Sequence, residues 1–588
     1  MSWRDTMCGE LTAVDVGRRV TVAGWADTRR DHGGLVFVDL RDYTGKVQLV
    51  VNPERSKQAA DEAHDVRNEF VLQAEGEVVA RAPEAVNPNL PTGQVEVQVD
   101  TLRIVSRSTP LPFQLDEENV DETLRLRYRW LDMRTERMQR NLRTSHVAVA
   151  AIRRRMDELG FIDVWTPSMT KGTPEGARDF LVPVRLQPGN FFALAQSPQL
   201  FKQLCMVGGM DRYYQIATCW RDEDLRADRQ FEFRQLDLEM SFVEREDVLD
   251  VLEQCVVASF EALGREPPPR PFPRLQFADV MLRYGSDKPD LRFGLEIQDA
   301  TEITRSSQFG VFAGAPVVRY LVAPRAFSRA ELGRLEEIAK EWGAKGLAYL
   351  VNDAGEVRSP IAKFLSEDEL AAFTGEANTT TLFAAADEAT VARVLGGLRT
   401  HLGRELDLAD RDSDSFAWTL DFPLFERHEE SEGWTFVHHP FTAPVAGDEH
   451  RIESDPGGVL GQHYDLIWNG WELGSGSIRI HEAERQEAVF RVMGMGADEQ
   501  EAKFKFLLDA LRMGAPPHGG FAMGIERFVA LLAGEPDIRQ VIPFPKVASG
   551  SDPLTGAPTP MPDSVLKELG IRSTVDEGAI GAPGGAEA

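Results

Sequence analysis

The chain has 588 residues, of which 65 are basic and 94 acidic, and its formal net charge is −29. That length exceeds what one hydrophobic core usually serves, so we expect about three to four domains. A composition of 42% apolar and 27% charged residues excludes wholesale disorder, and the acidic balance excludes a protein that holds nucleic acid by bulk electrostatics.

The N-terminal region, residues 1–107, has the pattern of short β-strands. Clusters of Gly, Asp, Asn and Pro separate five runs: RVTVAGWAD, GLVFVDLRD, KVQLVVN, FVLQAEGEVVA and QVEVQVDTLRIV. Five strands in this length predict a small closed barrel of the oligonucleotide-binding (OB) type.

Residues 108–138 are predicted to form a hinge that leads into a helix. In HVAVAAIRRRMDELG, apolar residues recur at helical spacing from Val149 to Leu159, and Gly160 ends the helix. A strand, FIDVWTP, follows directly. We expect the first part of a catalytic domain at residues 139–284.

Residues 285–412 show helices and strands without clusters of polar residues, between the Pro-rich REPPPRPFPR and DLADRDSDS. Because the flanking segments carry nearly all the chemically suggestive residues, we expect one catalytic domain, 139–284 with 413–560, interrupted by an inserted α/β domain. Residues 561–588 are predicted to be a C-terminal extension with a disordered Gly/Ala-rich tail. The expected fold class is multidomain α+β.

No stretch approaches the roughly twenty apolar residues that a membrane span needs, and the N-terminus is charged and polar. We therefore expect a cytoplasmic protein with no membrane partner and no DNA partner. There is no Cys-x-x-Cys pair and no Cys/His cluster at zinc-ligand spacing. The reduced packing residues expected instead are Cys8, Cys205, Cys219 and Cys255.

The first chemically suggestive segment is YYQIATCWRDEDLRADRQFEFRQLDLEMSF, two strand-like runs joined by a charged loop. From Gln235 to Phe242 polar and apolar side chains alternate, which gives one apolar face and one row of polar groups. An exposed sheet face would explain this pattern equally well. Arg221 at the end of the first run, and the loop from Arg226 through Arg229 to Gln230 that could close over a polyphosphate, favour a binding site.

The second segment, HYDLIWNGWELGSGSIRI, contains Asn469-Gly470, the strongest short hairpin signal. With these residues at the turn, Asp465 faces Gly474, and Asp465 and Glu472 share one sheet face. Two carboxylates on rigid strands predict a Mg²⁺ site when a nucleotide supplies the remaining oxygens, and a solvated acidic patch is the alternative. The glycines that follow allow a bulge that turns Arg479 into the same cleft.

The third segment, GGFAMGIERFVALL, predicts a Gly-rich strand that runs into a helix, with Arg527 near the junction. No Walker P-loop occurs, so by itself the segment is explained by close packing of a strand and a helix. Three further segments are TPEGARDF, QSPQLFKQL and VHHPFTAP. These segments contain polar residues that are predicted to lie in loops or at the start of a helix or strand: Glu175, Gln199, Lys202, His438 and His439.

Together and in this order, these segments resemble the class II aminoacyl-tRNA synthetases, and in particular the bacterial aspartyl-tRNA synthetase family. Class motif 1 resembles the helix and strand that end at Pro167, motif 2 resembles residues 213–242, and motif 3 resembles residues 519–532. The series TPEGARDFLVP, QSPQLFKQL, RDEDLRADRQ and HHPFTAP is very specific, and the likeness covers nearly the whole chain. It implies a catalytic domain built on an antiparallel sheet flanked by helices, and a GAD-like inserted domain that begins near GSDKPDLRFGLE.

The resemblance implies a role for each matched position. Arg221 is similar to the family arginine that bridges the substrate α-carboxylate and the ATP α-phosphate, and Arg527 to the arginine on the phosphate tail. These two form the expected catalytic set with Glu472, which together with Asp465 matches the Mg²⁺-linked acids. The matched ATP-binding positions are Arg221, Asp222, Glu223, Gln230, Glu472, Gly524, Ile525, Glu526 and Arg527.

Lys202 and Arg479 match the pair that grips the substrate side chain. The other positions expected around the amino acid are Glu175, Ser197, Gln199, Arg221, Asp237, His438 and His439. One departure lies in motif 3, where Glu526 stands in place of the usual Asp, with the charge kept.

In the barrel, Arg30, Phe37 and Gln48 match positions at which the family reads the anticodon. His32 and Val79 match positions linked to tRNA discrimination. Members that charge only the aspartate tRNA usually have Leu at the first position, whereas His is typical of members that also charge the asparagine tRNA.

The resemblance implies a homodimeric ligase that uses ATP and Mg²⁺ to activate L-aspartate as an adenylate. The adenylate is then loaded onto the aspartate tRNA and, given His32, onto the asparagine tRNA. Three alternatives stay open: strict charging of the aspartate tRNA, an asparaginyl or lysyl enzyme of the same subclass, and a silent RNA-binding or regulatory paralogue. Lys202 with Arg479 favours an acidic substrate, and a silent paralogue would have lost groups such as Arg221 that are present.

Overall fold

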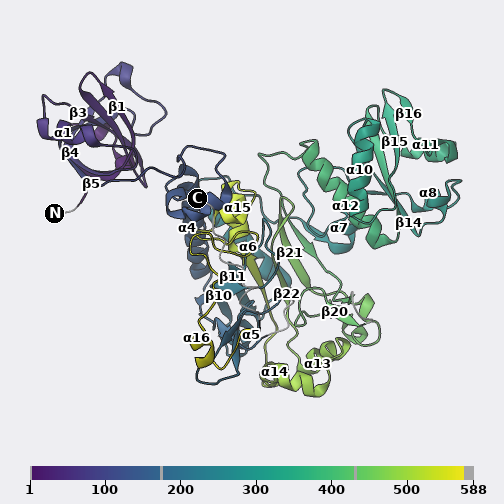
Figure 1. Cartoon of the computed structure of the whole chain (residues 1–588). Helices are drawn as coiled ribbons and strands as arrows, with labels where there is room; N and C mark the ends of the chain where they lie inside the picture. Colours follow the sequence, from purple (N-terminus) through teal and green to yellow (C-terminus); the bar gives the residue numbers. More distant parts are fainter. Residues whose placement is uncertain (1–2, 173–176, 429–432, 575–588) are drawn as a thin grey trace. The chain divides into compact units, whose positions relative to one another are not determined.

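The computed structural model describes residues 3–172, 177–428 and 433–574 (Figure 1). The chain divides into two compact units, Met1–Arg140 and Asn141–Ala588. Glu175 lies outside the described residues. The Gly/Ala-rich tail that was expected to be disordered also lies outside them, except for Thr574. No helix among the described residues is long and apolar enough to cross a membrane.

The first unit contains a closed barrel with the strand order β1-β2-β3-β5-β4. Its strands are β1 (Arg19–His32), β2 (Leu35–Asp42), β3 (Gly45–Val51), β4 (Val71–Ala80) and β5 (Val95–Ser106). Alternate side chains of β2 point inward, so that Val36, Val38 and Leu40 are buried. The predicted strands and the closed barrel are confirmed. The sequence pattern did not reveal the helix α1 (Lys57–Asp65), which packs on β5.

The segment predicted to be a hinge holds two short helices and the start of a long one: α2 (Glu122–Arg127), α3 (Arg129–Asp132) and α4 (Glu136–Glu158). The α4 helix ends just before Gly160, whose φ of 77° lies in the left-handed region, as expected of a glycine that ends a helix. Within the first unit, Glu69 is buried and accepts hydrogen bonds from Arg41 Nη2 at 2.8 Å and from Arg134 Nη1 at 2.9 Å. These contacts tie the linker to the barrel.

The second unit is built on an eight-stranded sheet with the order β12-β18-β21-β22-β23-β11-β10-β6. The strands are β6 (Ile162–Asp163), β10 (Arg212–Trp220), β11 (Glu232–Ser241), β12 (Arg274–Gln276), β18 (Phe416–Leu420), β21 (His463–Trp468), β22 (Trp471–Ile478) and β23 (His518–Gly524). One sheet thus combines strands from both sides of the inserted segment. All inner pairs are antiparallel, as expected, whereas β6 and β12 pair in parallel at the edges, which requires crossover connections.

Helices cover the apolar face of this sheet. Side chains of α4, α6 (Arg245–Ala262) and α15 (Ile525–Ala533) share a core with Leu236 and Leu238 of β11. The predicted alternation along β11 therefore places its apolar residues in the core and its polar residues on the opposite face. The alternation ends earlier than predicted, because Phe242 has a φ of 56° and turns out of the strand with 75% of its surface exposed.

Smaller elements surround the sheet. They are β7 (Met169–Thr170), β8 (Leu181–Pro183), β9 (Phe191–Leu194), α5 (Gln199–Val207), α7 (Phe277–Tyr284), β19 (Phe425–Arg427), β20 (Trp434–Phe436), α13 (Ala483–Val492), α14 (Ala497–Arg512) and α16 (Asp563–Glu568). None of the four cysteines forms a disulfide, and Cys8, Cys219 and Cys255 are buried, as expected of packing residues.

The inserted segment forms its own five-stranded antiparallel sheet with the order β13-β14-β17-β15-β16. Its strands are β13 (Gln298–Asp299), β14 (Val317–Ala323), β15 (Ala348–Asp353), β16 (Glu356–Arg358) and β17 (Thr379–Ala386). Its helices are α8 (Thr301–Thr304), α9 (Gly310–Ala313), α10 (Arg329–Glu341), α11 (Glu367–Phe373) and α12 (Glu388–Glu405). One apolar cluster packs α10 and α12 on this sheet, and a second contains residues of α9 and α11. This is the α/β arrangement expected for the insertion.

Candidate active site

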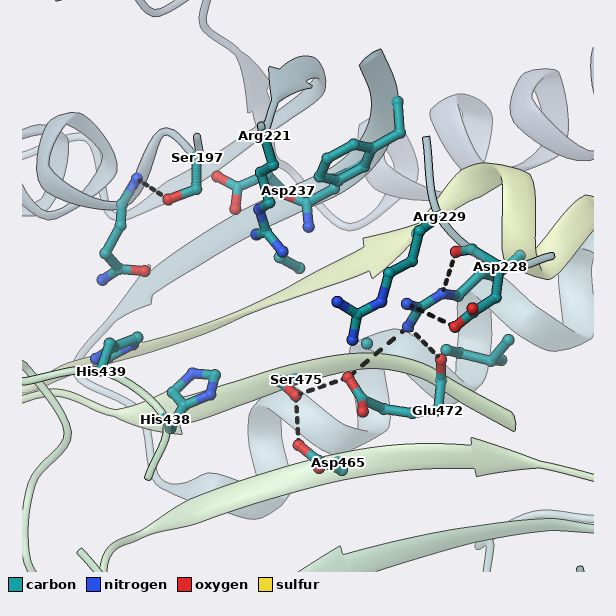
Figure 2. A pocket seen from close by; sticks show the side chains of 18 of the residues that line it. Ser197, Arg221, Asp228, Arg229, Asp237, His438, His439, Asp465, Glu472 and Ser475 are labelled. Atoms are coloured by element: carbon teal, nitrogen blue, oxygen red, sulfur yellow. Dashed lines mark hydrogen bonds and ion pairs between the residues drawn. The ribbon is translucent and has the colours of Figure 1, made fainter. Parts of the chain in front are cut away.

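A cavity of about 420 Å³ opens on the polar face of the eight-stranded sheet (Figure 2). Most of the residues predicted for the site line it: Ser197, Gln199, Lys202, Arg221, Glu223, Gln230, Asp237, His438, His439, Asp465, Glu472, Arg479, Gly524, Glu526 and Arg527. Neither Asp222 nor Ile525 lines the cavity. The side chain of Ile525 packs in the core instead. Segments that are far apart in the sequence therefore meet around one hollow.

The β21–β22 hairpin carries the two acids, and its register differs from the prediction. Asn469 and Gly470 form the turn with positive φ values of 51° and 80°. Asp465 faces Ser475 and not Gly474, because β22 bulges by one residue at Leu473. Ser475 Oγ lies 2.5 Å from Asp465 Oδ1 and 3.4 Å from an oxygen of Glu472, so the two carboxylates still converge.

The acid pair has the chemistry of a site for a hard cation. Burial and the nearby carboxylate of Asp465 raise the pKa of Glu472 above its usual value. An oxygen-binding divalent cation would relieve this repulsion, and Mg²⁺ accepts one or two carboxylates together with substrate phosphates. Among the described residues no group of three or more His, Cys, Asp or Glu side chains is arranged for a metal. The remaining ligands would therefore have to come from a bound substrate or water.

Two of the predicted arginines line the cavity. Arg221 follows β10, and its guanidinium carbon lies 5.0 Å from the centre of the Phe233 ring. Arg527, in the first turn of α15, donates to the carbonyl of Glu472 at 3.0 Å and pairs with Asp228 Oδ2 at 3.1 Å. The hairpin and the loop between β10 and β11 thus hold Arg527 at the cavity.

Two predicted nucleotide-binding side chains have partners within the protein. Gln230 donates to the carbonyl of Lys546 at 3.0 Å and accepts from its N–H at 2.8 Å. Glu526 accepts from the backbone N–H of Arg234 at 2.9 Å and from its Nε at 2.8 Å. The Glu526 carboxylate therefore fastens the start of α15 to β11, and an Asp would be one methylene shorter at this position.

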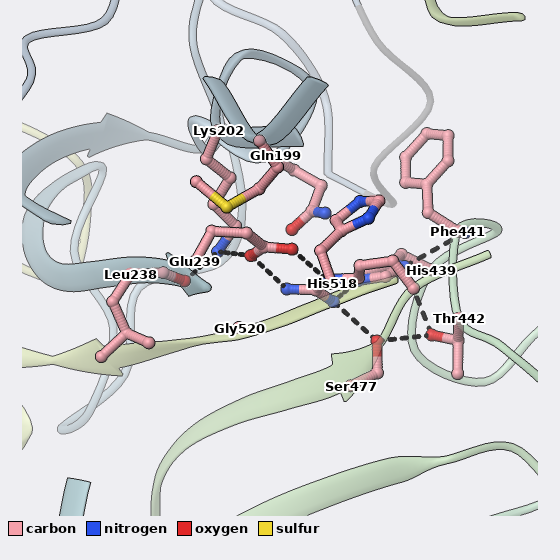
Figure 3. A network of polar contacts seen from close by, with 12 residues as sticks. Gln199, Lys202, Leu238, Glu239, His439, Phe441, Thr442, Ser477, His518 and Gly520 are labelled. Atoms are coloured by element: carbon pink, nitrogen blue, oxygen red, sulfur yellow. Dashed lines mark hydrogen bonds and ion pairs between the residues drawn. The ribbon is translucent and has the colours of Figure 1, made fainter. Parts of the chain in front are cut away.

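At the other end of the cavity, two cations and two carboxylates form a buried network, and Figure 3 shows the part of it around Lys202 and Glu239. Lys202 Nζ lies 2.7 Å from Asp237 Oδ1 and 3.4 Å from Glu239 Oε2. Arg479 pairs with both oxygens of Glu239, with Nε at 2.8 Å from one and Nη2 at 3.1 Å from the other. Lys202 and Arg479 are each 1% exposed and Glu239 is fully buried, so the cations are rigidly held.

Glu239 is a site residue for which the alternation along the strand predicted a place on the polar face but no role. It faces Gly520 of β23, where an added Cβ would lie 1.9 Å from Glu239 Oε2. The missing side chain therefore makes room for the carboxylate. Burial would raise the pKa of Glu239, but Arg479 and Lys202 outweigh burial and lower it, so the carboxylate stays charged.

Some buried polar atoms at this end have no hydrogen-bond partner. They include Asp237 Oδ2, an acceptor, and Gln199 Nε2, a donor. Leaving such atoms unpaired costs free energy, so each indicates a place where a polar ligand group would bind.

Three adjacent imidazoles, His438, His439 and His463, connect this network with the acid pair. The centroid of the His438 ring lies 4.2 Å from the centroid of the His439 ring and 4.2 Å from that of the His463 ring. His463 Nε2 lies 2.7 Å from Asp465 Oδ1, and Arg479 Nη1 donates to His439 Nε2 at 2.5 Å. Burial and neighbouring positive groups lower the pKa values of His438 and His439 well below the usual value, so both rings are neutral.

The five positions predicted in the barrel also lie near one another. Arg30 faces Phe37 across β1 and β2, and its Nη2 lies 3.3 Å from Gln48 Oε1. The His32 ring meets the edge of Phe37 at 5.9 Å between centroids and is exposed. Gln48 Nε2 donates to Glu96, the register partner of Val79 on the next strand.

Comparison with known proteins assigns both units. Residues 121–548 match the family described as tRNA synthetases class II (D, K and N), and residues 20–105 match the OB-fold nucleic acid binding domain. The chain belongs to the class II tRNA synthetases. The predicted resemblance, fold class and enzyme class are confirmed.

Curated relatives of this synthetase match along nearly their whole length. The chain is 48% identical over 587 residues to the aspartate–tRNA ligase of Geobacillus kaustophilus, covering 98% of this chain and 99% of the relative. It is 49% identical over 594 residues to the aspartate–tRNA(Asp/Asn) ligase of Symbiobacterium thermophilum, covering 97% and 100%. The asparaginyl-tRNA synthetase of Pyrococcus horikoshii, solved with asparaginyl-adenylate, shares the fold with a TM-score of 0.60 at 19% identity and covers 92% and 97%.

Proposed function

We propose that this synthetase is an aspartate–tRNA ligase, and the observation that carries the proposal is the buried network around Lys202 and Arg479. The two cations are balanced by two carboxylates before a substrate arrives. Aspartate would add one ammonium, for which Asp237 Oδ2 is an unpaired acceptor, and one side-chain carboxylate beside Arg479, so the balance is kept. Asparagine would bring the same ammonium without a side-chain carboxylate, which leaves an excess buried charge.

The reaction that this geometry supports is attack of the aspartate α-carboxylate on the α-phosphorus of ATP. The bond to the β-phosphate breaks, and aspartyl-adenylate and pyrophosphate form. The 3′-terminal hydroxyl of tRNA then attacks the activated carbonyl and releases AMP. Two anions must approach each other in the first step, so Arg221 at the α-phosphate and Arg527 at the phosphate tail would supply the opposing charge.

The residues at the nucleotide end have separate proposed tasks. Asp465 and Glu472 would hold Mg²⁺, which supplies further positive charge to the phosphate oxygens when bound. Glu223 and the backbone at Gly524 would contact the nucleotide, since both line the cavity beside Arg527. Gln230 and Glu526 would act indirectly, because their polar atoms already hold Lys546 and Arg234.

The barrel would read the anticodon. An unstacked base can lie on the half-exposed Phe37 ring while Arg30 and Gln48 offer polar groups. His32 beside Phe37, with Val79 near Gln48, supports charging of the asparagine tRNA as well, and several relatives carry the Asp/Asn name. The enzyme would act in the cytoplasm, where tRNA is used.

A homodimer is also proposed, since motif 1 implies it in the family. In the part of the chain that follows α4, Trp165 is 85% exposed and Ile162 is 51% exposed. Exposed apolar side chains can mark a protein–protein interface where they form a patch. A second copy would cover them.

The decisive experiment measures aspartate-dependent exchange of pyrophosphate into ATP and charging of purified aspartate and asparagine tRNAs. We expect exchange with aspartate only, charging of both tRNAs at comparable rates, and loss of exchange in Arg479→Leu. Exchange with asparagine but not with aspartate would overturn the substrate assignment. A strong preference for the aspartate tRNA would overturn the relaxed tRNA choice alone.

A variant of the barrel separates its role from catalysis. Phe37→Ala should lower charging at limiting tRNA and leave exchange unchanged, because the adenylate forms without the anticodon. Tyr43→Ala, at an exposed aromatic residue of the same barrel, is the matched control and should change neither. Equal charging by both variants would contradict the stacking role of Phe37.

A further inference from the structure

The inserted domain sends one side chain into the catalytic cavity and places a second beside the acid pair that lines it. Residues 285–294, the first of the insertion, are named here the root segment. Asp287 of this segment lines the cavity. The Lys288 ammonium lies 3.2 Å from Asp287 Oδ2 and 3.6 Å from Glu472 Oε2. A cation from the insertion therefore lies next to the acid pair. Arg527 also lies close to this pair, with its Nη1 3.9 Å from Glu472 Oε1.

The root segment is fixed to the catalytic sheet. Thr419, fully buried in β18, donates its hydroxyl to the carbonyl of Asp287 at 2.8 Å. The turn of the β21–β22 hairpin touches the segment as well, since a Cβ added to Gly470 would lie 3.1 Å from the Cβ of Asp290. The strands that carry Asp465 and Glu472 thus share contacts with the segment that carries Lys288.

On its other side the root segment is held by the inserted domain through Arg399 of α12 (Glu388–Glu405). Arg399 is 2% exposed, and its Nη2 donates to the carbonyls of Asp290, Phe293 and Gly294 at 2.8, 3.0 and 2.9 Å. Its guanidinium carbon lies 4.3 Å from the centre of the Phe293 ring. A buried arginine satisfied by three backbone carbonyls fixes the path of the segment.

The α12 helix is itself part of the core of the inserted domain. Its apolar residues pack on β14 and β17. Near Arg399 the helix approaches the root segment so closely that a Cβ on Gly396 would lie 2.2 Å from the carbonyl oxygen of Gly285. A continuous set of contacts therefore runs from the core of the inserted domain, through Arg399, to the root segment that carries Lys288.

We propose that Lys288 is a further nucleotide-binding residue, which counters the charge of Glu472 and binds the diphosphate end of ATP, and that Arg399 is a positioning residue that holds it there. The inserted domain then completes the active site and is more than an appendage. This inference rests on the proposed function, because it assigns one more side chain to the ATP of that reaction. An ammonium is a suitable partner for phosphate oxygens beside a carboxylate pair.

The first test compares Lys288→Met with Lys288→Arg in the full-length protein. We expect Lys288→Met to raise the KM for ATP in the exchange reaction about tenfold or more, the loss expected for one charge-assisted contact. The Kd of a non-hydrolysable ATP analogue with Mg²⁺, measured by calorimetry, should rise by a similar factor, while the KM for aspartate stays unchanged. Lys288→Arg should keep most of the affinity.

The matched control is Lys340→Met, which removes an exposed lysine of α10 in the same domain and should behave as the wild type. Unchanged ATP affinity in Lys288→Met, in an enzyme that carries out aspartate-dependent exchange, would overturn the inference and leave the proposed function intact. Absence of exchange in the wild type would instead overturn the proposed function.

The second test asks whether Arg399 acts through Lys288. Arg399→Lys keeps a buried cation but loses the planar fork, so we expect a higher KM for ATP and an unchanged KM for aspartate. In the double variant with Lys288→Met the losses should not add, because both changes remove the same contact. Additive losses, or equal increases in the two KM values, would show a general structural role and overturn the positioning assignment.

Discussion

Glu239 orients the positively charged guanidinium of Arg479 in the amino-acid pocket. Its carboxylate holds two nitrogens of Arg479 and lies 3.4 Å from Lys202, with no contact to water. The guanidinium is therefore oriented before any substrate binds. An enzyme that recognises an acidic side chain gains from such preorganisation, since little rearrangement is needed when the ligand arrives.

The stability of the free enzyme should depend on this carboxylate. Glu239→Gln leaves a buried cation without its counter-charge, which costs about 3 to 5 kcal/mol when one partner of a buried pair is removed. We expect a clear fall in the melting temperature, with a larger rise on addition of aspartate than in the wild type, because the ligand restores a negative charge.

Thermal denaturation with and without aspartate checks this prediction. Glu499→Gln, which alters an exposed pair with Lys503 on α14, is the matched control and should leave the melting temperature nearly unchanged. The prediction fails if Glu239→Gln melts with the control.

At the scale of single elements, β23 works through its glycines. Gly520 leaves room for the Glu239 carboxylate, and the backbone of Leu238 is also close, since an added Cβ would lie 2.2 Å from its carbonyl oxygen. On the neighbouring strand, a Cβ on Gly474 would lie 2.1 Å from the carbonyl oxygen of Ala522. The strand therefore approaches both neighbours more closely than side chains would allow.

Gly520→Ala should damage both stability and aspartate binding. The methyl group has no free space, so we expect a loss of about 1 to 3 kcal/mol and a displaced Glu239 carboxylate that raises the KM for aspartate. Gly333→Ala is the control, because nothing lies within 4 Å of the added Cβ on α10 and alanine favours a helix. Melting curves and exchange kinetics of both variants decide the point; a Gly520→Ala protein that resembles Gly333→Ala would contradict it.

The β21–β22 hairpin shows which features of a single element the sequence pattern could predict and which it could not. Asn469-Gly470 correctly predicted the turn, because a positive φ at both positions is a local property of these residues. The glycines of β22 indicated that a bulge was possible, but its place at Leu473 could not be predicted, because it depends on how β22 fits against β23, a strand far away in the sequence. The pairing of Glu239 with Arg479 was missed for the same reason: alternation gives the face of a side chain but not its partner.

At the scale of the whole molecule, the barrel and the interrupted catalytic sheet were predictable, since strand patterns and motif order are visible along the chain. The part played by the inserted domain was not, because GSDKPDLRFGLE has no periodic pattern and its meaning comes from contacts with Glu472 and Arg399. Domain boundaries remain predictions. The division that the contacts support is Met1–Arg140 and Asn141–Ala588.

Unfolding of the catalytic unit should respond to mild acid. Folding lowers the pKa values of His438 and His439 well below 6.5, so below about pH 6.5 the unfolded chain binds more protons than the folded one. Stability is then complete above this pH and falls as the pH drops toward the folded pKa values. At pH 5.5 the loss is at most about 1.4 kcal/mol for each ring.

Melting temperatures at pH 7.5 and 5.5 measure this effect. The variant with both His438→Gln and His439→Gln should lose less stability between the two pH values than the wild type. His401→Gln, at a more exposed ring paired with Glu405, should lose as much as the wild type. Identical pH responses in all three proteins would rule out buried neutral imidazoles as the cause.

The strand order has a consequence for synthesis on the ribosome. β23 is the last strand of the eight to be translated, yet it lies between β22 and β11. Until residues 518–524 leave the exit tunnel, the two halves of the sheet present open hydrogen-bonding edges that can pair with other nascent chains. The barrel has no such delay, since all its strands are made first. The emerging polypeptide can therefore complete its barrel well before its catalytic sheet.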